Sequence, residues 1–310
     1  MIVITGTVAW DYIMEFPGNF GDHILPEHIH NVNLSFIVNK YAKRRGGTAG
    51  NVSYTMGLLA TPHILFTAAG EDFAEYAKDF KKVGIDTRHV DIIKKEHTAT
   101  GFAMTDKSNN QIWGYYYGAA EKNTSLSLKR VVKKKDLVLI GPQGAEGSMH
   151  FVDECIKLGI AYIFDPGFIL TQVSDTDLTR GIIHAAYVIG NEYEMELIAK
   201  RVKNWKTLRK EKIVITTLSE KGATIEGHGK QYTIRPIPNK GVASTTGAGD
   251  SWRAGFLAGL QRGFDILACG QMGAVAASFT VEHFGTQEHI FSISQFKKRY
   301  QDSFGQTIKL

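Results

Sequence analysis

Short apolar runs that end in a glycine or a polar residue recur along the chain, and amphipathic stretches often follow them. Uninterrupted apolar runs of this length are typical of parallel strands that are buried on both faces. The helical stretches between them include residues 149–159 and 192–201. Strands alternating with helices predict an α/β fold with a doubly wound, mostly parallel sheet. The expected strands lie in MIVITG (1–6), DLVLIG (136–141), AYIFDPG (161–167), AAYVIGNEYE (185–194) and KIVITTL (212–218).

Two segments interrupt this alternation. Within residues 12–45, apolar residues alternate with polar ones, and within residues 98–120 a DKSNN turn joins two aromatic-rich runs, which is typical of a hairpin. We therefore expect residues 1–310 to form one domain with a small antiparallel sheet inserted at about 12–45 and 98–120, placed as a lid. The lid aromatics either cover a core or stack on a planar ligand. The alternating apolar residues are Val32, Leu34, Phe36 and Val38.

Composition and charge restrict the partners. The chain is 43% hydrophobic and 22% charged, as in ordinary globular proteins, and its net charge is a mild +5. The densest basic cluster, LKRVVKKKD (128–136), carries valines at helical spacing and is interpreted as a solvated helix face. Nucleic-acid binding would need a longer basic stripe with aromatic or arginine side chains, so it is not expected. A mild positive charge suits anionic substrates such as nucleotides.

The cysteines and the N-terminal segment indicate a cytoplasmic protein. Cys155 and Cys269 are far apart and show no metal-ligand spacing, so neither a disulfide framework nor a zinc site is expected. The first residues lack the basic start and cleavage pattern of a signal peptide. No apolar run has the length of a membrane span, so no membrane association is expected.

Glycine clusters provide the first candidate site. In RRGGTAGNVSYTMGLLA (44–60), Gly46, Gly47 and Gly50 precede Asn51 and a helical pattern. Small residues let the backbone approach a ligand, and a helix start offers unpaired N–H groups. The same pattern is equally typical of a tight turn that packs a helix against a sheet.

The second cluster, STTGAGDSWRAGF (244–256), is neither a dinucleotide fingerprint nor a Walker A loop. Trp252 stands where the third glycine of the fingerprint would be needed, and no lysine–serine/threonine pair follows. Its N–H groups at a helix start would favour an anion. Asp250 either caps that helix or accepts a proton from a nucleophile, and the residues alone leave both open.

Together the two clusters resemble the two signatures of the ribokinase-like, or PfkB-type, carbohydrate kinase family. They are GGTAGN (46–51) and TTGAGDSWRAGFLAGL (245–260), and the resemblance extends over essentially the whole chain. It implies a doubly wound α/β domain with a β-sheet lid, and transfer of the ATP γ-phosphoryl group to a sugar hydroxyl. Three further segments resemble bacterial, mycobacterial-type adenosine kinases within the family. They are FPGNFGDHILPEHIHNVNLSF (16–36), AAGEDFAEY (68–76) and FGTQE (284–288).

The resemblance implies an adenosine kinase that makes AMP from adenosine and ATP, in purine salvage. Its alternative is a PfkB-type kinase acting on a different nucleoside, on ribose or on a sugar. By the same resemblance Asp250 is the general base, and Gly247, Ala248 and Gly249 form the anion hole. Asn191 and Glu194 would organise Mg²⁺ and phosphates, with Glu194 reaching the metal through water. Thr217 and Gly222 would form the nucleotide-binding turn.

The resemblance also implies the acceptor site and a homodimer formed through the lid. Asp11 would accept hydrogen bonds from two ribose hydroxyls, and lid aromatics would face the base. The substrate-binding residues carried over are Thr7, Asp11, Ser35, Phe36, Gly47, Asn51, Phe102 and Tyr115.

Several positions depart from the family pattern. Ser244 replaces an aspartate that commonly helps to bind a monovalent cation, which leaves potassium dependence open. Ser219 replaces a glycine of the nucleotide turn, and Gly101 stands where mycobacterial relatives carry a phenylalanine, with Phe102 next to it. After Asp165 and Pro166 the chain has Gly167 and Phe168 instead of polar residues, so the base pocket is expected to differ.

Overall fold

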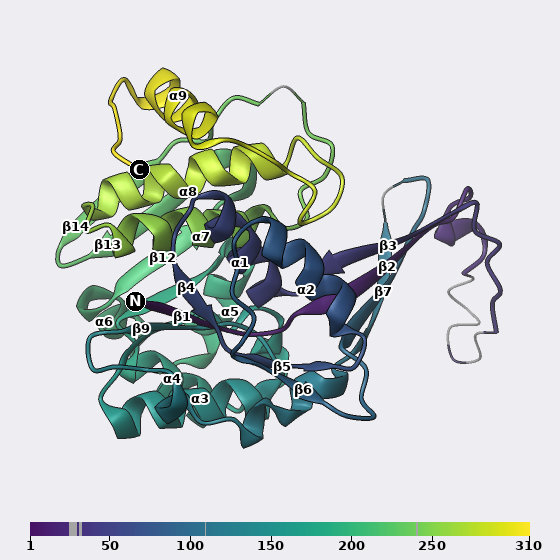
Figure 1. The fold of residues 1–310 in the computed structure, drawn as a ribbon, viewed down its shortest axis with the longest axis horizontal. Helices are drawn as coiled ribbons and strands as arrows, with labels where there is room; N and C mark the ends of the chain where they lie inside the picture. The colour runs from purple at the N-terminus through teal and green to yellow at the C-terminus, as the bar shows by residue number, and fades with distance from the viewer. Residues whose placement is uncertain (25–29, 31–32, 109, 240) are drawn as a thin grey trace.

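The computed structural model describes residues 1–24, 30, 33–108, 110–239 and 241–310. An eight-stranded sheet forms the body of the molecule, and a four-stranded sheet projects from one side of it (Figure 1). The strand order of the large sheet is β14-β13-β12-β11-β10-β9-β1-β4. The strands β12, β11, β10, β9, β1 and β4 pair in parallel with their neighbours. At the other edge, β13 pairs antiparallel with β12 and with β14.

The five predicted buried strands are confirmed. They are β1 (Ile2–Thr5), β9 (Leu137–Ile140), β10 (Ala161–Phe164), β11 (Tyr187–Asn191) and β12 (Ile213–Thr217). Three strands of the same sheet were not predicted: β4 (His63–Leu65), β13 (Ala223–Gly227) and β14 (Lys230–Ile234). A two-stranded parallel sheet, β5 (Thr67–Gly70) and β6 (Val90–Ile93), lies beside the body.

Helices cover both faces of the large sheet, with α7, α8 and α9 above it and α3 and α4 below it in Figure 1. Successive strand residues alternate between two cores: Ile4 packs with the helices of one face, and Val3 with those of the other. This double burial explains why the strands are apolar throughout. The helices are α1 (Thr48–Leu58), α2 (Phe73–Lys82), α3 (Ala145–Leu158), α4 (Asp175–His184), α5 (Glu192–Arg201), α6 (Trp205–Glu211), α7 (Ala248–Gln261), α8 (Ile266–Thr280) and α9 (Ile293–Phe304).

Two further sequence expectations can be compared with these elements. The basic cluster 128–136 is not the face of a helix, because only the 3₁₀ turn Leu128–Arg130 forms there. Among the described residues, no helix has both the length and the apolar character required to cross a membrane.

The projecting sheet corresponds to the predicted lid, but it is mixed instead of antiparallel. Its order is β3 (Lys40–Gly46), β2 (Ala9–Glu15), β7 (Ala99–Thr105), β8 (Gln111–Tyr116), and β2 pairs with β7 in parallel. The strand suggested by the alternation of Leu34, Phe36 and Val38 does not form, and the chain pairs from Lys40 onward. Val32 lies outside the described residues.

Candidate functional site

Two cavities meet at the start of α7. The first, the lid cavity, has a volume of about 190 Å³ and lies between the lid sheet and the body. The second, the strand-end cavity, has a volume of about 690 Å³ and lies at the carboxyl ends of β10, β11 and β12. Thr48, Phe168 and Asp250 line both cavities. A group at Asp250 can therefore act on a ligand in either cavity.

The first turn of α7 offers unpaired N–H groups to the strand-end cavity. Gly247 precedes the helix with a φ of 82°, a conformation that favours glycine. The N–H groups of Gly249 and Asp250 have no hydrogen-bond partner within the part of the chain that is described, whereas the Ala248 N–H donates to the Thr245 carbonyl at 3.3 Å. The anion hole of Gly247, Ala248 and Gly249 stays a prediction, and the N–H groups free to bind an anion at this helix end are those of Gly249 and Asp250.

Asp250 does not cap the helix, so that interpretation is wrong. It is the third residue of α7, and its Oδ2 accepts a hydrogen bond from Asn51 Nδ2 at 2.7 Å. Burial raises the pKa of Asp250 to about 6, although the Arg253 charge and the Asn51 hydrogen bond lower it. A carboxylate with this pKa is ionised near neutral pH and can accept a proton.

Gln287 fixes the amide of Asn51. Its Nε2 donates to Asn51 Oδ1 at 2.9 Å and to the Tyr76 hydroxyl at 2.6 Å, and the side chains of Gln287, Asn51 and Tyr76 are all buried. Because Oδ1 of Asn51 already accepts a hydrogen bond, its Nδ2 faces Asp250. In the sequence, Gln287 belongs to the segment FGTQE (284–288), which resembles adenosine kinases, but no role was predicted for it.

Asp11 lies in the lid cavity, and two glycines make room for its carboxylate. A side-chain carbon at Gly46 would stand 2.0 Å from Asp11 Oδ2, and one at Gly101 would stand 2.7 Å from Asp11 Oδ1. A side chain at Gly101 would displace the Asp11 carboxylate from its present position, so glycine leaves room for the carboxylate here. Burial, and then the charge of Asp250, raise the pKa of Asp11 to about 7.

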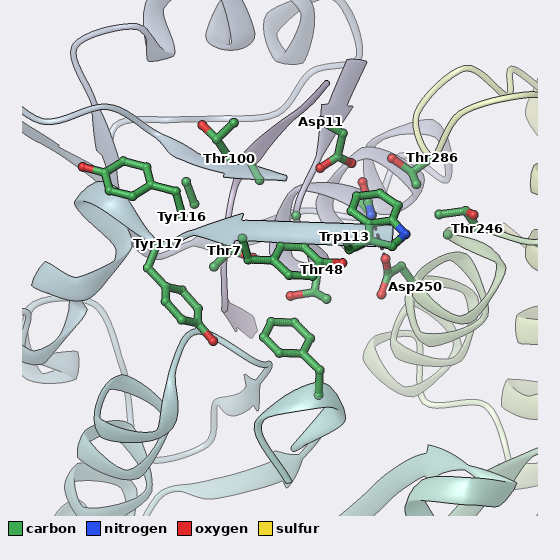
Figure 2. Close-up of a pocket in the computed structure, with 17 residues that line it drawn as sticks. Thr7, Asp11, Thr48, Thr100, Trp113, Tyr116, Tyr117, Thr246, Asp250 and Thr286 are labelled. Atoms are coloured by element: carbon green, nitrogen blue, oxygen red, sulfur yellow. Dashed lines mark hydrogen bonds between the residues drawn. The ribbon is translucent and has the colours of Figure 1, made fainter. Parts of the chain in front are cut away.

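Aromatic rings line the lid cavity, and Figure 2 shows Asp11 and Asp250 toward one end of it and Tyr116 and Tyr117 toward the other. Tyr115 lies in the cavity, as predicted. Its ring is parallel to that of Trp113, with centroids 5.4 Å apart, and to that of Phe168, at 5.6 Å. Trp113 and Phe168 were not predicted as ligand contacts, although both stand in or next to segments that the sequence singled out.

Three predicted lid contacts lie elsewhere. Phe102 stacks on Tyr12 at 5.4 Å, because the strand register places both on the face opposite Asp11 and Gly101. Phe36 packs edge-on against Phe16 at 4.8 Å, in a cluster at the far end of the lid. Phe102, Phe36 and Ser35 line neither the lid cavity nor the strand-end cavity.

The connection from β1 to β2 and the start of α1 complete the lid cavity. Thr7, Gly47 and Asn51 line it, as predicted. Gly47 has a φ of 81°, and a side-chain carbon there would stand 2.5 Å from the Thr7 carbonyl oxygen. Thr48, which the sequence did not indicate, has a buried hydroxyl with no hydrogen-bond partner among the described residues. Its place between the two cavities makes this hydroxyl available to a ligand.

The predicted nucleotide residues line the strand-end cavity: Asn191, Glu194, Thr217 and Gly222. Asn191 and Glu194 form a reciprocal cap at the start of α5, with Glu194 Oε2 accepting the Asn191 N–H at 2.7 Å. Burial raises the pKa of Glu194. No cluster of three or more histidine, cysteine or acidic side chains suited to a metal occurs within the described ranges. Ser219, in the predicted nucleotide-binding turn, has a φ of 52°. This backbone conformation is unfavourable for residues other than glycine.

A buried ion pair also borders this cavity, and the sequence gave no role to its arginine. Arg253 lies one turn after Gly249 on α7, and its Nε and Nη2 donate to the two oxygens of Asp165, the latter at 2.7 Å. Arg253 and Asp165 are both buried. Burial lowers the pKa of Arg253, but the charge and hydrogen bonds of Asp165, together with the charges of Asp250 and Glu194, outweigh it and raise the pKa.

The site and the fold agree with the comparisons to known proteins. The family model described as pfkB family carbohydrate kinase matches residues 15–292, so the chain belongs to the pfkB family of carbohydrate kinases. The chain is therefore an ATP-dependent kinase with a ribokinase-like fold. The two cavities with one carboxylate between them are its candidate active site.

Relatives named nucleoside kinase match nearly the whole chain. The protein from Methanothermobacter thermautotrophicus is 30% identical over 98% of this chain and 96% of its own length. The one from Methanocaldococcus jannaschii is 31% identical over 93% of each. The Burkholderia thailandensis nucleoside kinase in complex with inosine has a TM-score of 0.90 and 27% identity, covering 99% of this chain and 100% of its own. The expected similarity to adenosine kinases in particular is not confirmed, because these relatives carry the broader name.

Proposed function

We propose that the protein is a nucleoside kinase that transfers the γ-phosphoryl group of ATP to the 5′-hydroxyl of a nucleoside. The observation that carries this proposal is the position of Asp250, between a cavity with a carboxylate and aromatic rings and a cavity with free helix N–H groups. The names of the relatives support the same substrate class. The B. thailandensis kinase has also been captured with ADP and inosine.

In this proposal the nucleoside occupies the lid cavity. The Asp11 carboxylate accepts hydrogen bonds from the two vicinal ribose hydroxyls. Hydrogen bonds to an ionised acceptor are stronger than those between neutral groups. The base lies among Trp113, Tyr115 and Phe168, and stacking on aromatic side chains contributes about 1–3 kcal/mol per base. Ribose alone would leave this aromatic part of the cavity unused, which favours a nucleoside over ribose.

ATP occupies the strand-end cavity, with its transferring phosphoryl group at the Gly249 and Asp250 N–H groups. Asp250 accepts the proton of the 5′-hydroxyl as the oxygen attacks phosphorus. Mg²⁺ suits this cavity because ions of this kind retain waters and are held largely by phosphates, with Glu194 reaching the ion through water. When bound, Mg²⁺ neutralises charge on the phosphate oxygens.

Many of the polar groups that line the lid cavity are hydroxyls, including those of Thr7, Thr100 and Tyr117. A hydroxyl can donate or accept a hydrogen bond. The cavity can therefore pair with the 6-amino group of adenosine or the 6-oxo group of inosine, and we propose both as substrates.

The proposal is tested by ADP release in a coupled assay with adenosine, inosine, guanosine, cytidine, ribose and fructose 6-phosphate. We expect turnover with at least one purine nucleoside and a much lower kcat/KM for ribose and fructose 6-phosphate. Turnover with a sugar alone would make the protein a sugar kinase of the same family. No turnover with any acceptor would refute a kinase of this substrate range.

Replacing Gln287 by leucine is expected to move the acid limb of the pH–rate profile to higher pH. The Asn51 hydrogen bond lowers the pKa of Asp250, and without Gln287 the Asn51 amide is no longer held toward Asp250. The wild type should lose activity as pH falls through about 6, where Asp250 becomes protonated. Tyr54→Phe, which removes a hydrogen bond to His289 in the same loop, is the control and should leave the profile in place.

Activity is expected to be the same in potassium and in choline salts. The hydroxyl of Ser244 accepts the Thr246 N–H at 3.2 Å, and the nearby Val281 carbonyl accepts the Ala243 N–H at 2.7 Å. No negative charge stands at this position to hold a cation. Initial rates at constant ionic strength measure the effect, and a several-fold stimulation by potassium would contradict the expectation. Ser244→Asp should gain sensitivity to potassium.

We also propose that two copies associate through the face of the lid that points away from Asp11. Tyr12, Tyr41 and Phe102 stack there, and Tyr41 and Phe102 are 63% and 47% exposed. Phe102→Glu is expected to convert a dimer into a monomer in sedimentation experiments. Ile290→Glu, at a similarly exposed apolar residue outside the lid, should not change the mass. A monomeric wild type would contradict this proposal.

A further inference from the structure

Arg253 is the only basic side chain among the described residues that line the strand-end cavity. Four acidic residues line the same cavity: Asp165, Glu194, Glu220 and Asp250. A nucleoside triphosphate would bring further negative charge into it. The side chains alone would therefore repel the donor unless the charge of Arg253 faces the phosphates.

The geometry leaves one nitrogen of Arg253 for a ligand. Nε and Nη2 donate to the two oxygens of Asp165, and this fork holds the guanidinium in one orientation. No hydrogen-bond partner of Nη1 occurs among the described residues. A side-chain carbon placed at Gly249 would stand 2.9 Å from Nη1, so this nitrogen lies beside Gly249, the residue whose N–H group is free.

We propose that Arg253 is a catalytic residue whose Nη1 donates a hydrogen bond to the phosphoryl group as it is transferred. This inference rests on the proposed kinase reaction. The bond from phosphorus to the β,γ-bridging oxygen breaks and leaves its electron pair on ADP. The bond from phosphorus to the acceptor oxygen forms, and the hydroxyl proton passes to Asp250. Arg253 stabilises the negative charge on the transferring oxygens without giving up a proton.

The position of Arg253 also reduces the repulsion between Asp250 and the phosphate. A carboxylate that must accept a proton close to the transferring group would otherwise oppose its approach, because both are negative. Arg253 lies one helical turn from Asp250, and the charges of the two residues interact. Asp165 thereby acts as a positioning residue, since its two oxygens hold the guanidinium of Arg253 in one orientation.

Arg253→Gln is expected to lower kcat by about 10²–10³-fold, as loss of one oxyanion donor does. The affinity for the β,γ-imido analogue of ATP should fall, while the affinity for ADP, which lacks the transferred group, should not. Both affinities are measured by calorimetry without a nucleoside. Arg209→Gln removes a similar fork, to Glu226, away from both cavities and is the matched control.

A purely structural role predicts a different result. If Arg253 only anchors α7 through Asp165, then Asp165→Asn and Arg253→Gln would lower kcat and Tm equally, and ATP-analogue and ADP binding would fall together. That outcome would overturn the inference. If Arg253→Gln does not fold, the double variant with Asp165→Asn avoids an unpaired buried charge and should show the same selective losses. The binding measurements remain decisive even if no tested nucleoside is phosphorylated.

Discussion

Asp250→Asn is expected to lower kcat by about 10²–10⁴-fold, the usual contribution of a positioned general base. Asparagine keeps the shape of the side chain and an oxygen that can accept the Asn51 hydrogen bond, so the cavity should remain intact. It cannot accept the hydroxyl proton. Single-turnover rates with a saturating purine nucleoside and ATP measure the loss, and KM for the nucleoside should change little.

Two further measurements separate loss of the base from loss of the fold. Thermal unfolding of Asp250→Asn should show no destabilisation, because a buried carboxylate is replaced by a neutral group. ADP binding, followed by calorimetry, should be close to that of the wild type. A variant that retains a third or more of the wild-type kcat would show that Asp250 is not the base.

Asp11→Asn is expected to raise KM for the nucleoside by about 10²-fold, since hydrogen bonds to a charged group each contribute about 1.5–3 kcal/mol. Substrates that differ at the ribose give the sharper readout. The wild type should discriminate against 2′-deoxyadenosine relative to adenosine, and Asp11→Asn should lose most of that discrimination. Equal discrimination in both proteins would remove Asp11 from the ribose site.

The same substitution should stabilise the protein at alkaline pH. Burial raises the pKa of Asp11 to about 7 in the folded state, from an ordinary value of 3.8. Folding therefore disfavours its ionised form, and this penalty grows as pH rises from about 3.8 to about 7 and is complete above the folded pKa. Asp11→Asn should raise Tm more at pH 8 than at pH 5, and an equal change at both values would contradict this. The protein retains this carboxylate at a cost in stability, as functional sites often do.

The central sheet could be predicted from the sequence because its signal is local. Each buried parallel strand must be apolar on both faces, so β1, β9, β10, β11 and β12 are visible as runs in the chain. The strands β13 and β14, of which β14 forms the edge, were missed because the apolar pattern of one antiparallel hairpin is weaker than that of strands buried on both faces. The alternation before β3 failed because its aromatic member, Phe36, packs against other aromatic side chains instead of pairing in a sheet.

The sequence by itself determined the family, the doubly wound fold and the two glycine clusters that form the junction of the cavities. Buried parallel strands need apolar residues and tight turns need glycines, so these features can be recognised from residue types along the chain. Only the tertiary structure decided which lid residues face the ligand, because the strand register turns Tyr115 toward Asp11 and Phe102 away from it. The Asn51 and Gln287 pair and the Arg253 and Asp165 pair join residues far apart in the chain. Contacts of this kind leave no local pattern, since folding alone brings their partners together.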